Sequence, residues 1–392
     1  MRTHPIDADL LRGLAELERT DRGWLPHRLP ARARAQCTDP QLTTVEAQPS
    51  GVRLAFRTRS TVIELDLLRT RMVLVGIPDR PDGTVDLLVD GTLVGQATTT
   101  NGDVVRADLA SGRTDVERGS VGVVRFTDLP ARDKEVEIWL PHYERVELVA
   151  LRSDAPISPA LAGQRRVWLH HGSSISQGSN APSPSATWPA LAASLGGVEL
   201  INLGLAGSAM LDPFTARAMR DTPADVISVK IGINLVNADV MRLRAFGPAV
   251  HGFLDTIRDG HPSVPLLVVG PLYCPIHENT PGPGTFDVAG LAAGVVRFVA
   301  TGDPDGAARG SLTLTVIRER LAELVSSRMA DDPHLYYLDG HDLYGPADSA
   351  EHPLPDNLHP DADTHRMVGE RFARLAFLAG GPFADAAAAH TG

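Results

Sequence analysis

The sequence is poor in cysteine and lacks any long run of apolar residues. Two lone cysteines, Cys37 and Cys274, indicate neither a disulfide framework nor a zinc site, so a reducing cytosol is the compartment that fits. The opening residues carry no apolar signal segment, and no later stretch approaches the ~18 apolar residues of a membrane span. We therefore expect a cytoplasmic protein that is neither exported nor inserted into a membrane.

Positive charge is also scarce. The chain has 37 Lys and Arg against 48 Asp and Glu, a net charge of −11, with only two lysines and no basic tract. A protein that follows nucleic-acid phosphates needs the opposite balance, so we expect no nucleic-acid partner. A composition of 43% hydrophobic and 22% charged residues excludes disordered, collagen-like and coiled-coil classes. At 392 residues the chain is long for one core and fits two domains.

The first half of the chain has the pattern of an antiparallel β-domain. Residues 62–67 alternate apolar and acidic side chains, as a half-buried strand does. Asp90-Gly91 separates two more apolar runs, which is a strong hairpin signal. Further strands are indicated at residues 136–140 and 146–151. We therefore predict an N-terminal β-sandwich, jelly-roll-like, over residues 1–158.

The second half alternates between buried strands and helices. Such alternation predicts a parallel sheet covered on both faces, so we expect a three-layer α/β/α domain over residues 159–392. The last helix is predicted to start after His359, with Pro360 in its first turn. The predicted strands are residues 167–170, 198–203, 226–231, 266–269 and 335–338, and the predicted helices include residues 188–195 and 314–325.

Four short polar sequences follow predicted strands or precede the last helix. Ligands of parallel sheets bind beyond the carboxyl ends of the strands, so these sequences are candidates for a functional site. Each alone has an ordinary structural explanation, as a plain Ser/Gly loop, a helix-capping Asn or a helix-capping His. The four are Gly172-Ser-Ser-Ile-Ser-Gln-Gly178, Asn202-Leu-Gly-Leu-Ala-Gly207, Gly232-Ile-Asn234 and Asp356-Asn-Leu-His359-Pro360.

In combination the four sequences supply the parts of a nucleophilic site. A serine on a strand-to-helix turn exposes its Oγ, and glycine lets backbone N–H groups approach a ligand closely. An asparagine amide is a neutral donor suited to a developing oxyanion, and an Asp three residues before a His can fix the imidazole tautomer. The serine turn is not the Gly-x-Ser-x-Gly elbow of α/β-hydrolases, because Ser176 occupies the place of the second glycine.

The combination resembles the SGNH/GDSL hydrolase superfamily over roughly residues 163–380. The Asp that usually precedes the nucleophile is Ser173 here, a form familiar in the branch that carries Gly-Ser-Ser-Ile-(Thr/Ser)-Gln-Gly. The first half is similar to the β-sandwich that precedes the SGNH domain in that branch, especially around Trp139-Leu-Pro-His-Tyr143. The matching block residues are Ser174, Gly207, Asn234, Asp356 and His359.

The resemblance implies a serine-dependent acyl-transfer enzyme. It assigns Ser174 as the nucleophile that becomes acylated, His359 as general base and then general acid, and Asp356 as the residue that orients His359. The backbone N–H groups of Ser174 and Gly207 and the side-chain amide of Asn234 are the implied oxyanion donors. No cofactor is implied.

The reaction and its substrates are left open by these residues. The branch resemblance and the absence of an export signal favour an O-acyltransferase. Such an enzyme moves an acyl group, for example an aromatic salicylyl-like one, from a thioester or ester donor to a hydroxyl group. The acceptor is expected to be a small-molecule natural product, as in antibiotic biosynthesis. The alternatives are a carboxylesterase or carbohydrate O-deacetylase acting through the same acyl-enzyme, and a glycan-binding protein with an inactive SGNH scaffold. The oligomeric state is also open.

Two further stretches are weaker candidates. His170 and His171 adjoin the serine turn, and in an alternating strand only one of them can face the site. The Pro/Gly-rich residues 277–286 follow a strand and fit either a lid or acceptor-binding loop, or a solvated connection.

Three arginines lie at alternate or nearby positions of one predicted strand, and two kinds of ligand-binding motif are absent from the sequence. Arg53, Arg57 and Arg59 alternate on one predicted strand face, where a solvated face is favoured over a carboxylate- or sugar-binding one. No metal-ligand motif and no phosphate-binding glycine motif is present, so we expect neither a metal nor a nucleotide cofactor.

Overall fold

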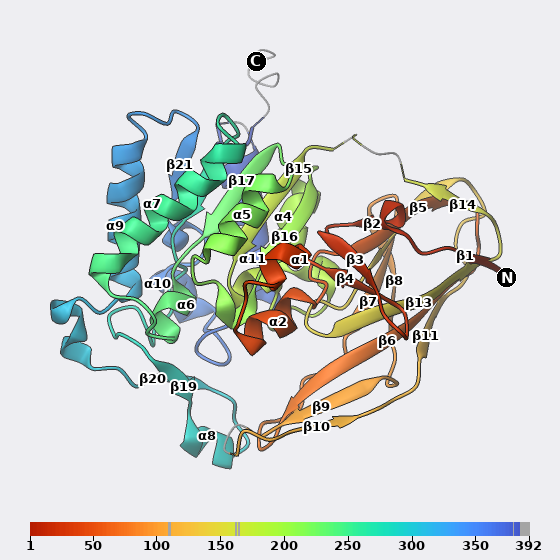
Figure 1. The fold of residues 1–392 in the computed structure, drawn as a ribbon, viewed down its shortest axis with the longest axis horizontal. Coiled ribbons are helices and arrows are strands. Elements are labelled where there is room, and N and C mark those ends of the chain that lie inside the picture. The colour runs from red at the N-terminus through yellow and green to blue at the C-terminus, as the bar shows by residue number, and fades with distance from the viewer. Residues whose placement is uncertain (109–110, 161–162, 164, 379, 385–392) are drawn as a thin grey trace. The chain divides into compact units, whose positions relative to one another are not determined.

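The structure is a computed structural model that describes residues 1–108, 111–160, 163, 165–378 and 380–384 (Figure 1). By its internal contacts the chain divides into two compact units. The division is not a single cut in the sequence, because one short segment from each half groups with the other unit. The first unit comprises Met1–Arg34, Thr43–Gln164 and Pro182–Ser185, and the second comprises Ala35–Leu42, Arg165–Ala181 and Ala186–Gly392.

The first unit consists of two sheets. One has eight strands in the order β10-β9-β6-β13-β4-β3, with β1 pairing β13 and β11 pairing β6, and the other has six in the order β14-β5-β12-β7-β8, with β2 pairing β5. The predicted β-sandwich is confirmed, with the correction that β6 and β9 pair in parallel. The elements are β1 (Arg2–His4), β2 (Leu11–Arg12), β3 (Glu16–Arg19), β4 (Trp24–His27), α1 (Ala31–Arg34), β5 (Arg53–Thr58), β6 (Ile63–Leu74), β7 (Thr84–Val89), β8 (Thr92–Thr98), β9 (Asp103–Ala107), β10 (Thr114–Glu117), β11 (Gly122–Phe126), β12 (Lys134–Trp139), β13 (Arg145–Ser153) and β14 (Ile157–Pro159), together with α2 (Pro40–Glu46), whose residues 40–42 group with the second unit.

Local sequence explains how these strands form. In β6, Ile63, Leu65 and Leu67 are buried in the sandwich core, while the acidic residues between them are only half-buried. The β7–β8 hairpin turns at Asp90 and Gly91, whose φ angles of 48° and 78° are both positive. That left-handed pair is what a two-residue hairpin needs to match the twist of its strands, and it confirms the predicted hairpin.

The three arginines predicted to share one solvated face do not share one environment. Arg53 is only 2% exposed, and its guanidinium lies 4.7 Å from the centre of the Trp139 ring. Arg57 is half-buried and pairs with Asp133, and Arg59 is exposed. The prediction of a solvated face is therefore wrong for Arg53, which belongs to the packing of the six-stranded sheet.

The second unit is built on a parallel five-stranded sheet in the order β16-β15-β17-β18-β21. Helices cover this sheet, which confirms the predicted three-layer α/β/α class (Figure 1). The elements are β15 (Val167–Gly172), α3 (Ser174–Gln177), α4 (Trp188–Leu195), β16 (Glu199–Gly204), α5 (Pro213–Asp221), β17 (Val226–Lys230), α6 (Ile233–Asn237), α7 (Leu243–Gly260), β18 (Leu266–Val269), β19 (Gly284–Phe286), α8 (Val288–Ala292), β20 (Phe298–Ala300), α9 (Leu314–Arg328), β21 (Leu335–Leu338), α10 (Pro346–Glu351) and α11 (Ala362–Phe372).

Aromatic packing fixes helices α4 and α11 against β15. The Trp168 ring of β15 stacks on Phe372 of α11 with ring centres 5.0 Å apart, and Trp188 of α4 lies 5.2 Å from the same ring. Helix α11 begins after its cap Asp361, whose side chain accepts a hydrogen bond from the N–H of Thr364. Pro360 therefore precedes the cap and is not in the first turn, because it is the Asp361 carboxylate that satisfies a free N–H of this turn.

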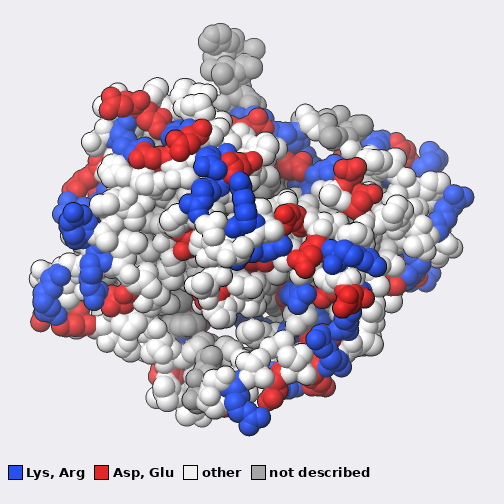
Figure 2. Space-filling view, in the orientation of Figure 1, with Lys and Arg blue, Asp and Glu red and all other residues white. Residues whose placement is uncertain are grey.

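Charges of both signs are mixed on the face of the molecule that Figure 2 shows. In the view of Figure 2, the side chains of Lys and Arg lie among those of Asp and Glu and do not gather by sign. In the part of the chain that the structure describes, no helix combines the length and the apolar character needed to cross a membrane.

Candidate active site

The serine turn lies between β15 and α3. Ser173 caps the helix, because its Oγ accepts the N–H of Ile175 at 3.3 Å, and Ser174 is the first helical residue. A side chain at Gly172 would place its Cβ 2.3 Å from Ser176 Oγ, so the strand has to end on glycine here. Ser174 is 9% exposed, so its hydroxyl lies in a largely desolvated position.

The hydroxyl, the imidazole and the carboxylate lie in a row. Ser174 Oγ is 3.0 Å from His359 Nε2, and His359 Nδ1 is 2.8 Å from Asp356 Oδ2. These residues come from opposite ends of the second unit, yet both distances are within hydrogen-bonding range. The arrangement matches a nucleophile, a general base and a residue that orients the base.

The Asp356 carboxylate also holds its own turn in shape. Its Oδ1 accepts the backbone N–H groups of Leu358 at 2.9 Å and His359 at 2.6 Å. Burial alone would raise the pKa of Asp356, but the hydrogen bonds and charge of His359 and these backbone donors outweigh it and lower the pKa. The carboxylate is therefore ionised at neutral pH and can stabilise an imidazolium.

The predicted oxyanion donors come from a turn that follows β16 and a helix that follows β17. Gly207 lies in the short 3-10 turn Ala206–Ser208 after β16, and Asn234 is the second residue of α6. Asn234 Oδ1 accepts the N–H of Ala209 at 3.2 Å, so the amide links α6 to the chain after the glycine turn and its oxygen is already engaged. The cap of α6 is Gly232, so the alternative role of Asn234 as a helix cap does not apply.

A segment from the first half of the sequence reaches the glycine turn. Asp39 Oδ2 accepts the hydroxyl of Ser208 at 3.0 Å. The Gln41 amide lies so close to Gly207 that a Cβ there would stand 2.6 Å from Gln41 Nε2. Sequence reasoning missed both residues, because nothing in the local pattern around residues 35–42 indicates a partner more than 160 positions away.

Asn180 and Phe298 are also missed by sequence reasoning. Asn180 Nδ2 lies 3.4 Å from Asp356 Oδ2, and an amide two residues after the first block was the available signal. The Phe298 ring meets the His359 ring edge-on, with ring centres 5.5 Å apart. No local pattern identifies Phe298, because its contact depends on a strand pairing and on a turn far along the chain.

The two histidines beside the serine turn are parts of the core. His170 is fully buried, with Nδ1 at 2.7 Å from Ser228 Oγ and Nε2 at 2.8 Å from Ser176 Oγ. Burial lowers the pKa of His170 well below its usual value, so the ring is neutral. His171 is 2% exposed, and its Nδ1 lies 2.8 Å from Leu203 O. Neither ring is exposed toward a substrate.

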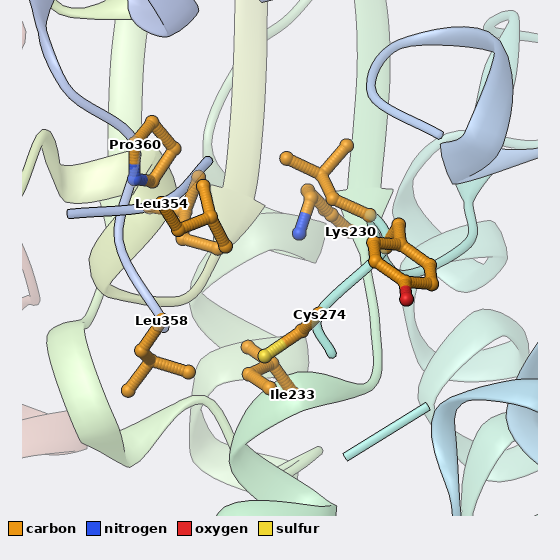
Figure 3. Close-up of a pocket in the computed structure, with 9 residues that line it drawn as sticks. Lys230, Ile233, Cys274, Leu354, Leu358 and Pro360 are labelled. Carbon is orange, nitrogen blue, oxygen red and sulfur yellow. The ribbon is translucent and has the colours of Figure 1, made fainter. Parts of the chain in front are cut away.

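A small cavity lies among residues that adjoin the site in sequence (Figure 3). Ile175, Ile233 and Leu358 line it, together with the side chains of Lys230 and Cys274. Burial lowers the pKa of Lys230 to about 8 and raises the pKa of Cys274 to about 12. Lys230 is 4% exposed, so its amine is buried beside this cavity.

Metal-ligating side chains do not gather in the described ranges. Across those residues, no three or more of His, Cys, Asp and Glu are placed to hold a metal ion. The groups that the site offers for chemistry are a hydroxyl, an imidazole, a carboxylate and amide donors.

Comparison with known proteins identifies relatives of both halves. Residues 165–273 match the GDSL-like lipase/acylhydrolase family. The salicylyl-acyltransferase SsfX3 from a tetracycline biosynthetic pathway is similar at 27% identity and a TM-score of 0.77, over 94% of this chain and 95% of that one. No curated protein matches.

Two further solved structures share the fold. A protein described as a GDSL-like lipase from Bacteroides ovatus has 20% identity and a TM-score of 0.64, over 93% of each chain. A family two carbohydrate esterase from Clostridium thermocellum has 12% identity and a TM-score of 0.54, over 83% of this chain and 90% of that one. The predicted resemblance to the SGNH/GDSL superfamily is confirmed.

Proposed function

We propose that this chain is a serine-dependent O-acyltransferase. Ser174 is its nucleophile, His359 its general base and acid, and Asp356 the carboxylate that orients His359. The premise is the match of residues 165–273 to the GDSL-like lipase/acylhydrolase family. The family match and the acyltransferase and esterase relatives support acyl transfer or hydrolysis as the class of reaction. The observation that carries the assignment is the 3.0 Å distance from Ser174 Oγ to His359 Nε2, continued by 2.8 Å from Nδ1 to Asp356.

The first half-reaction acylates the serine. His359 Nε2 takes the proton of Ser174 as Oγ bonds to the acyl carbon of the donor, and Asp356 stabilises the imidazolium. The oxygen that becomes negative is held by the N–H groups of Ser174 and Gly207 and by the Asn234 amide, whose oxygen is already engaged. When the intermediate collapses, the bond to the leaving group breaks and His359 returns its proton to that group, a thiolate or an alkoxide.

The second half-reaction decides between transfer and hydrolysis. An acceptor hydroxyl gives its proton to His359 and bonds to the acyl carbon, and the bond to Ser174 Oγ breaks as the proton passes to that oxygen. Water follows the same steps and yields a free acid, so a carboxylesterase or carbohydrate O-deacetylase is the alternative. The third hypothesis is an inactive glycan-binding scaffold. The hydrogen bonds that connect Ser174, His359 and Asp356 argue against it.

Transfer to a small-molecule natural product is supported by one relative above all. SsfX3 aligns over nearly the whole of both chains, at higher identity and TM-score than the two lipase and esterase structures described above. We therefore propose a thioester or ester donor, a hydroxyl acceptor of the natural-product class, as in antibiotic biosynthesis, and a cytoplasmic location. The N-terminal sandwich, proposed as a domain over residues 1–158, precedes a catalytic domain over 159–392.

Active-site labelling tests the proposed nucleophile. A fluorophosphonate reacts with a serine only when a base activates it, so wild type should be labelled and Ser174→Ala should not. Ser176→Ala is the matched control, because Ser176 lies two residues away with its hydroxyl bound to His170. Absence of labelling in wild type, or equal labelling of Ser174→Ala, contradicts the proposal.

Product partition tests transfer against hydrolysis. The enzyme is acylated with an aryl ester or a short acyl thioester in the presence of increasing concentrations of an alcohol. Transfer predicts that ester product rises at the expense of free acid until the acceptor saturates. If no alcohol competes with water at any concentration, the esterase alternative replaces the acyltransferase.

A further inference from the structure

The segment between β18 and α9 carries an ordered hairpin. Strands β19 and β20 pair antiparallel, with Gly284 opposite Ala300 and Phe286 opposite Phe298. The base is closed by Thr301, whose N–H and Oγ1 both donate to the carbonyl of Pro283, at 2.8 and 2.9 Å. We call residues 284–300 the arm. Of the Pro/Gly-rich residues 277–286, the last three form β19 of this arm.

One side of the arm is attached to the helix that carries Asn234. Gly284 of β19 lies against α6 so closely that a Cβ would stand 2.1 Å from Asn237 Oδ1. The same oxygen lies 3.2 Å from Nε2 of His277, which is fully buried. The start of the arm is thus held to the element that supplies an oxyanion donor.

The other side of the arm is attached to the turn that carries the acid–base pair. The N–H of Phe298 donates to the carbonyl of Asp356 at 2.9 Å, and Asn357 Nδ2 donates to the carbonyl of Phe298 at 3.2 Å. These two bonds hold the backbone of β20 beside the turn. They place the Phe298 side chain at His359, where the ring centres are 5.5 Å apart.

The arm therefore presents two aromatic rings next to the general base. Phe286 and Phe298 lie with ring centres 4.7 Å apart, and both side chains are only half-buried. Half-exposed aromatic surface is costly in water and gains free energy when a ligand covers it. The two nitrogens of His359 already face Ser174 and Asp356, so an acceptor hydroxyl has to reach Nε2 past neighbouring surfaces that include Phe298.

We propose that Phe286 and Phe298 form the acceptor subsite and take an alcohol with an apolar ring. The ring of the acceptor packs on the phenylalanine pair while its hydroxyl faces His359 Nε2, and the same apolar surface keeps water from that nitrogen. Binding of this kind raises the effective concentration of the alcohol over that of water. The inference rests on the proposed acyl-Ser174 intermediate and specifies what attacks it.

The test is the partition of one acyl-enzyme between two alcohols and water. Wild type is acylated with 4-nitrophenyl acetate, and ester and acid products are measured with benzyl alcohol or with 2-methoxyethanol, a small polar alcohol. We expect wild type to prefer benzyl alcohol. Phe298→Ala and Phe286→Ala should each lower the ester-to-acid ratio with benzyl alcohol by about tenfold, with less change for 2-methoxyethanol.

Two further variants separate a subsite from a structural role. Val288→Ala removes an exposed side chain on the same arm, and its ratio should equal that of wild type. Phe298→Leu keeps apolar surface and should restore part of the ratio lost in Phe298→Ala. The ratio is set per acyl-enzyme molecule, so a smaller folded fraction does not change it.

The outcomes distinguish this inference from the proposed function. Ratios that are unchanged in Phe286→Ala and Phe298→Ala, or that fall equally for both alcohols, overturn the subsite while the acyl-enzyme stands. Absence of ester product with benzyl alcohol in wild type overturns it as well. If mass spectrometry detects no acetyl group on Ser174, the proposed function fails, and the subsite fails with it.

Discussion

At the scale of single residues, Asp356 does two things that one substitution can separate. Its Oδ2 faces His359 Nδ1, and its Oδ1 holds the turn through two backbone N–H groups. Asp356→Asn keeps an acceptor for the turn but loses the charge that stabilises the imidazolium. We expect kcat to fall by about 10³- to 10⁴-fold with little change in the melting temperature. Steady-state kinetics and thermal unfolding measure both, and activity within tenfold of wild type contradicts the assigned role.

Lys230 is a second residue whose chemistry predicts a measurable effect. Its pKa falls from the ordinary 10.5 to about 8 because burial disfavours the charged form. Between pH 8 and 10.5 the unfolded chain therefore binds a proton that the folded chain lacks, and the stability contributed by this group rises with pH. Below pH 8 the cost of burying the Lys230 ammonium lowers the unfolding free energy by its full amount, on the order of 3 kcal/mol.

Lys230→Met removes that penalty while keeping a long apolar side chain. Urea unfolding should show the variant to be more stable than wild type at pH 7, with the difference shrinking toward pH 10. A gain of the same size at both pH values would mean that packing, and not ionisation, is responsible. Lys134→Met is the comparison, because the Lys134 ammonium donates to the carbonyls of Ser60 and Pro130 and its loss should destabilise.

At the scale of elements, the sequence predicts the positions of buried strands but not those of elements that are placed by long-range contacts. Strands β18 and β21 lie where their apolar runs predict them, and β18 is buried throughout, as a parallel strand covered on both faces is. The serine turn and the Asp356–His359 turn are equally local signals. The β19–β20 hairpin is not predicted, since its place depends on bonds to Asp356 and Asn357, about 60 residues further along the chain.

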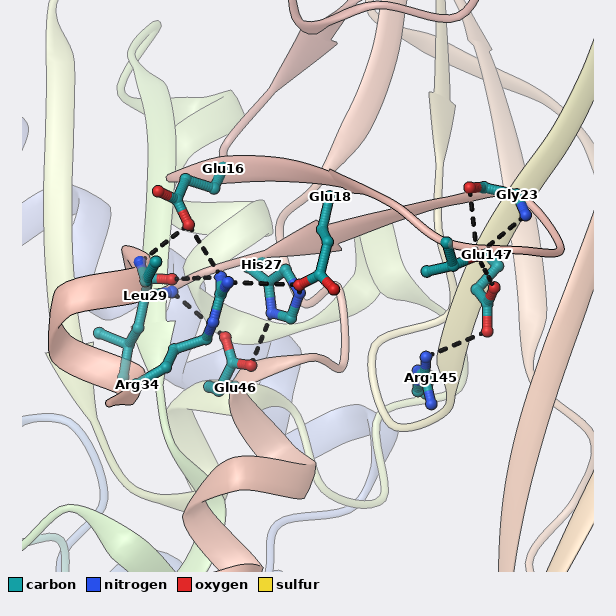
Figure 4. A network of polar contacts seen from close by, with 11 residues as sticks. Glu16, Glu18, Gly23, His27, Leu29, Arg34, Glu46, Arg145 and Glu147 are labelled. Carbon is teal, nitrogen blue, oxygen red and sulfur yellow. Dashed lines mark hydrogen bonds and ion pairs between the residues drawn. The ribbon is translucent and has the colours of Figure 1, made fainter. Parts of the chain in front are cut away.

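Long-range polar contacts escape prediction for the same reason. In the first unit, His27 of β4 lies between Glu46 of α2 and Glu18 of β3, at 2.7 and 2.9 Å (Figure 4). Each of these residues looks like an ordinary surface side chain in the sequence. Only the fold shows that the Glu46 side chain is 3% exposed, whereas that of Glu18 is 51% exposed.

That difference in exposure predicts unequal effects of two similar substitutions. Glu46→Ala leaves His27 Nδ1 without its buried partner and should cost about 3 kcal/mol of unfolding free energy. Glu18→Ala removes a solvated partner of the same ring and should cost less than about 1 kcal/mol. Urea unfolding of the two variants measures the contrast, and equal costs would show that the buried contact is no stronger than the exposed one.

At the scale of the whole molecule, each compact unit contains a segment from the other half of the sequence. Residues 35–42 supply Asp39 and Gln41 to the second unit, and Pro182–Ser185 belongs to the first. Composition and strand patterns predicted two architectures in order along the chain. They did not predict this exchange, because a few residues in a loop carry no periodic signal for the unit on which they pack.

The side chain of Asp86 binds one of the exchanged segments, Pro182–Ser185. Its carboxylate is fully buried in β7, and Oδ2 accepts the hydroxyls of Ser183 and Ser185, each at 2.6 Å, and the N–H of Ser185 at 3.0 Å. Gln96 donates to Oδ1 at 2.8 Å. Asp86→Ala leaves the buried hydroxyl of Ser183 and the half-buried hydroxyl and N–H of Ser185 without their acceptor, so we expect a loss of about 3 kcal/mol in unfolding free energy.

The same contact predicts how a truncated chain behaves. A fragment of residues 159–392 keeps Ser174, Asp356 and His359 but loses Asp39, Gln41 and the acceptor for Ser183 and Ser185. We expect the fragment to label poorly with a fluorophosphonate and to unfold at a lower temperature, and full-length Asp86→Ala to fall between it and wild type. Ser183→Ala in the full chain, which removes only one donor to Asp86, should cost about 1 kcal/mol. A fragment as stable and as reactive as the intact protein would show that the second half of the sequence folds without the first, and that the exchanged segments are incidental.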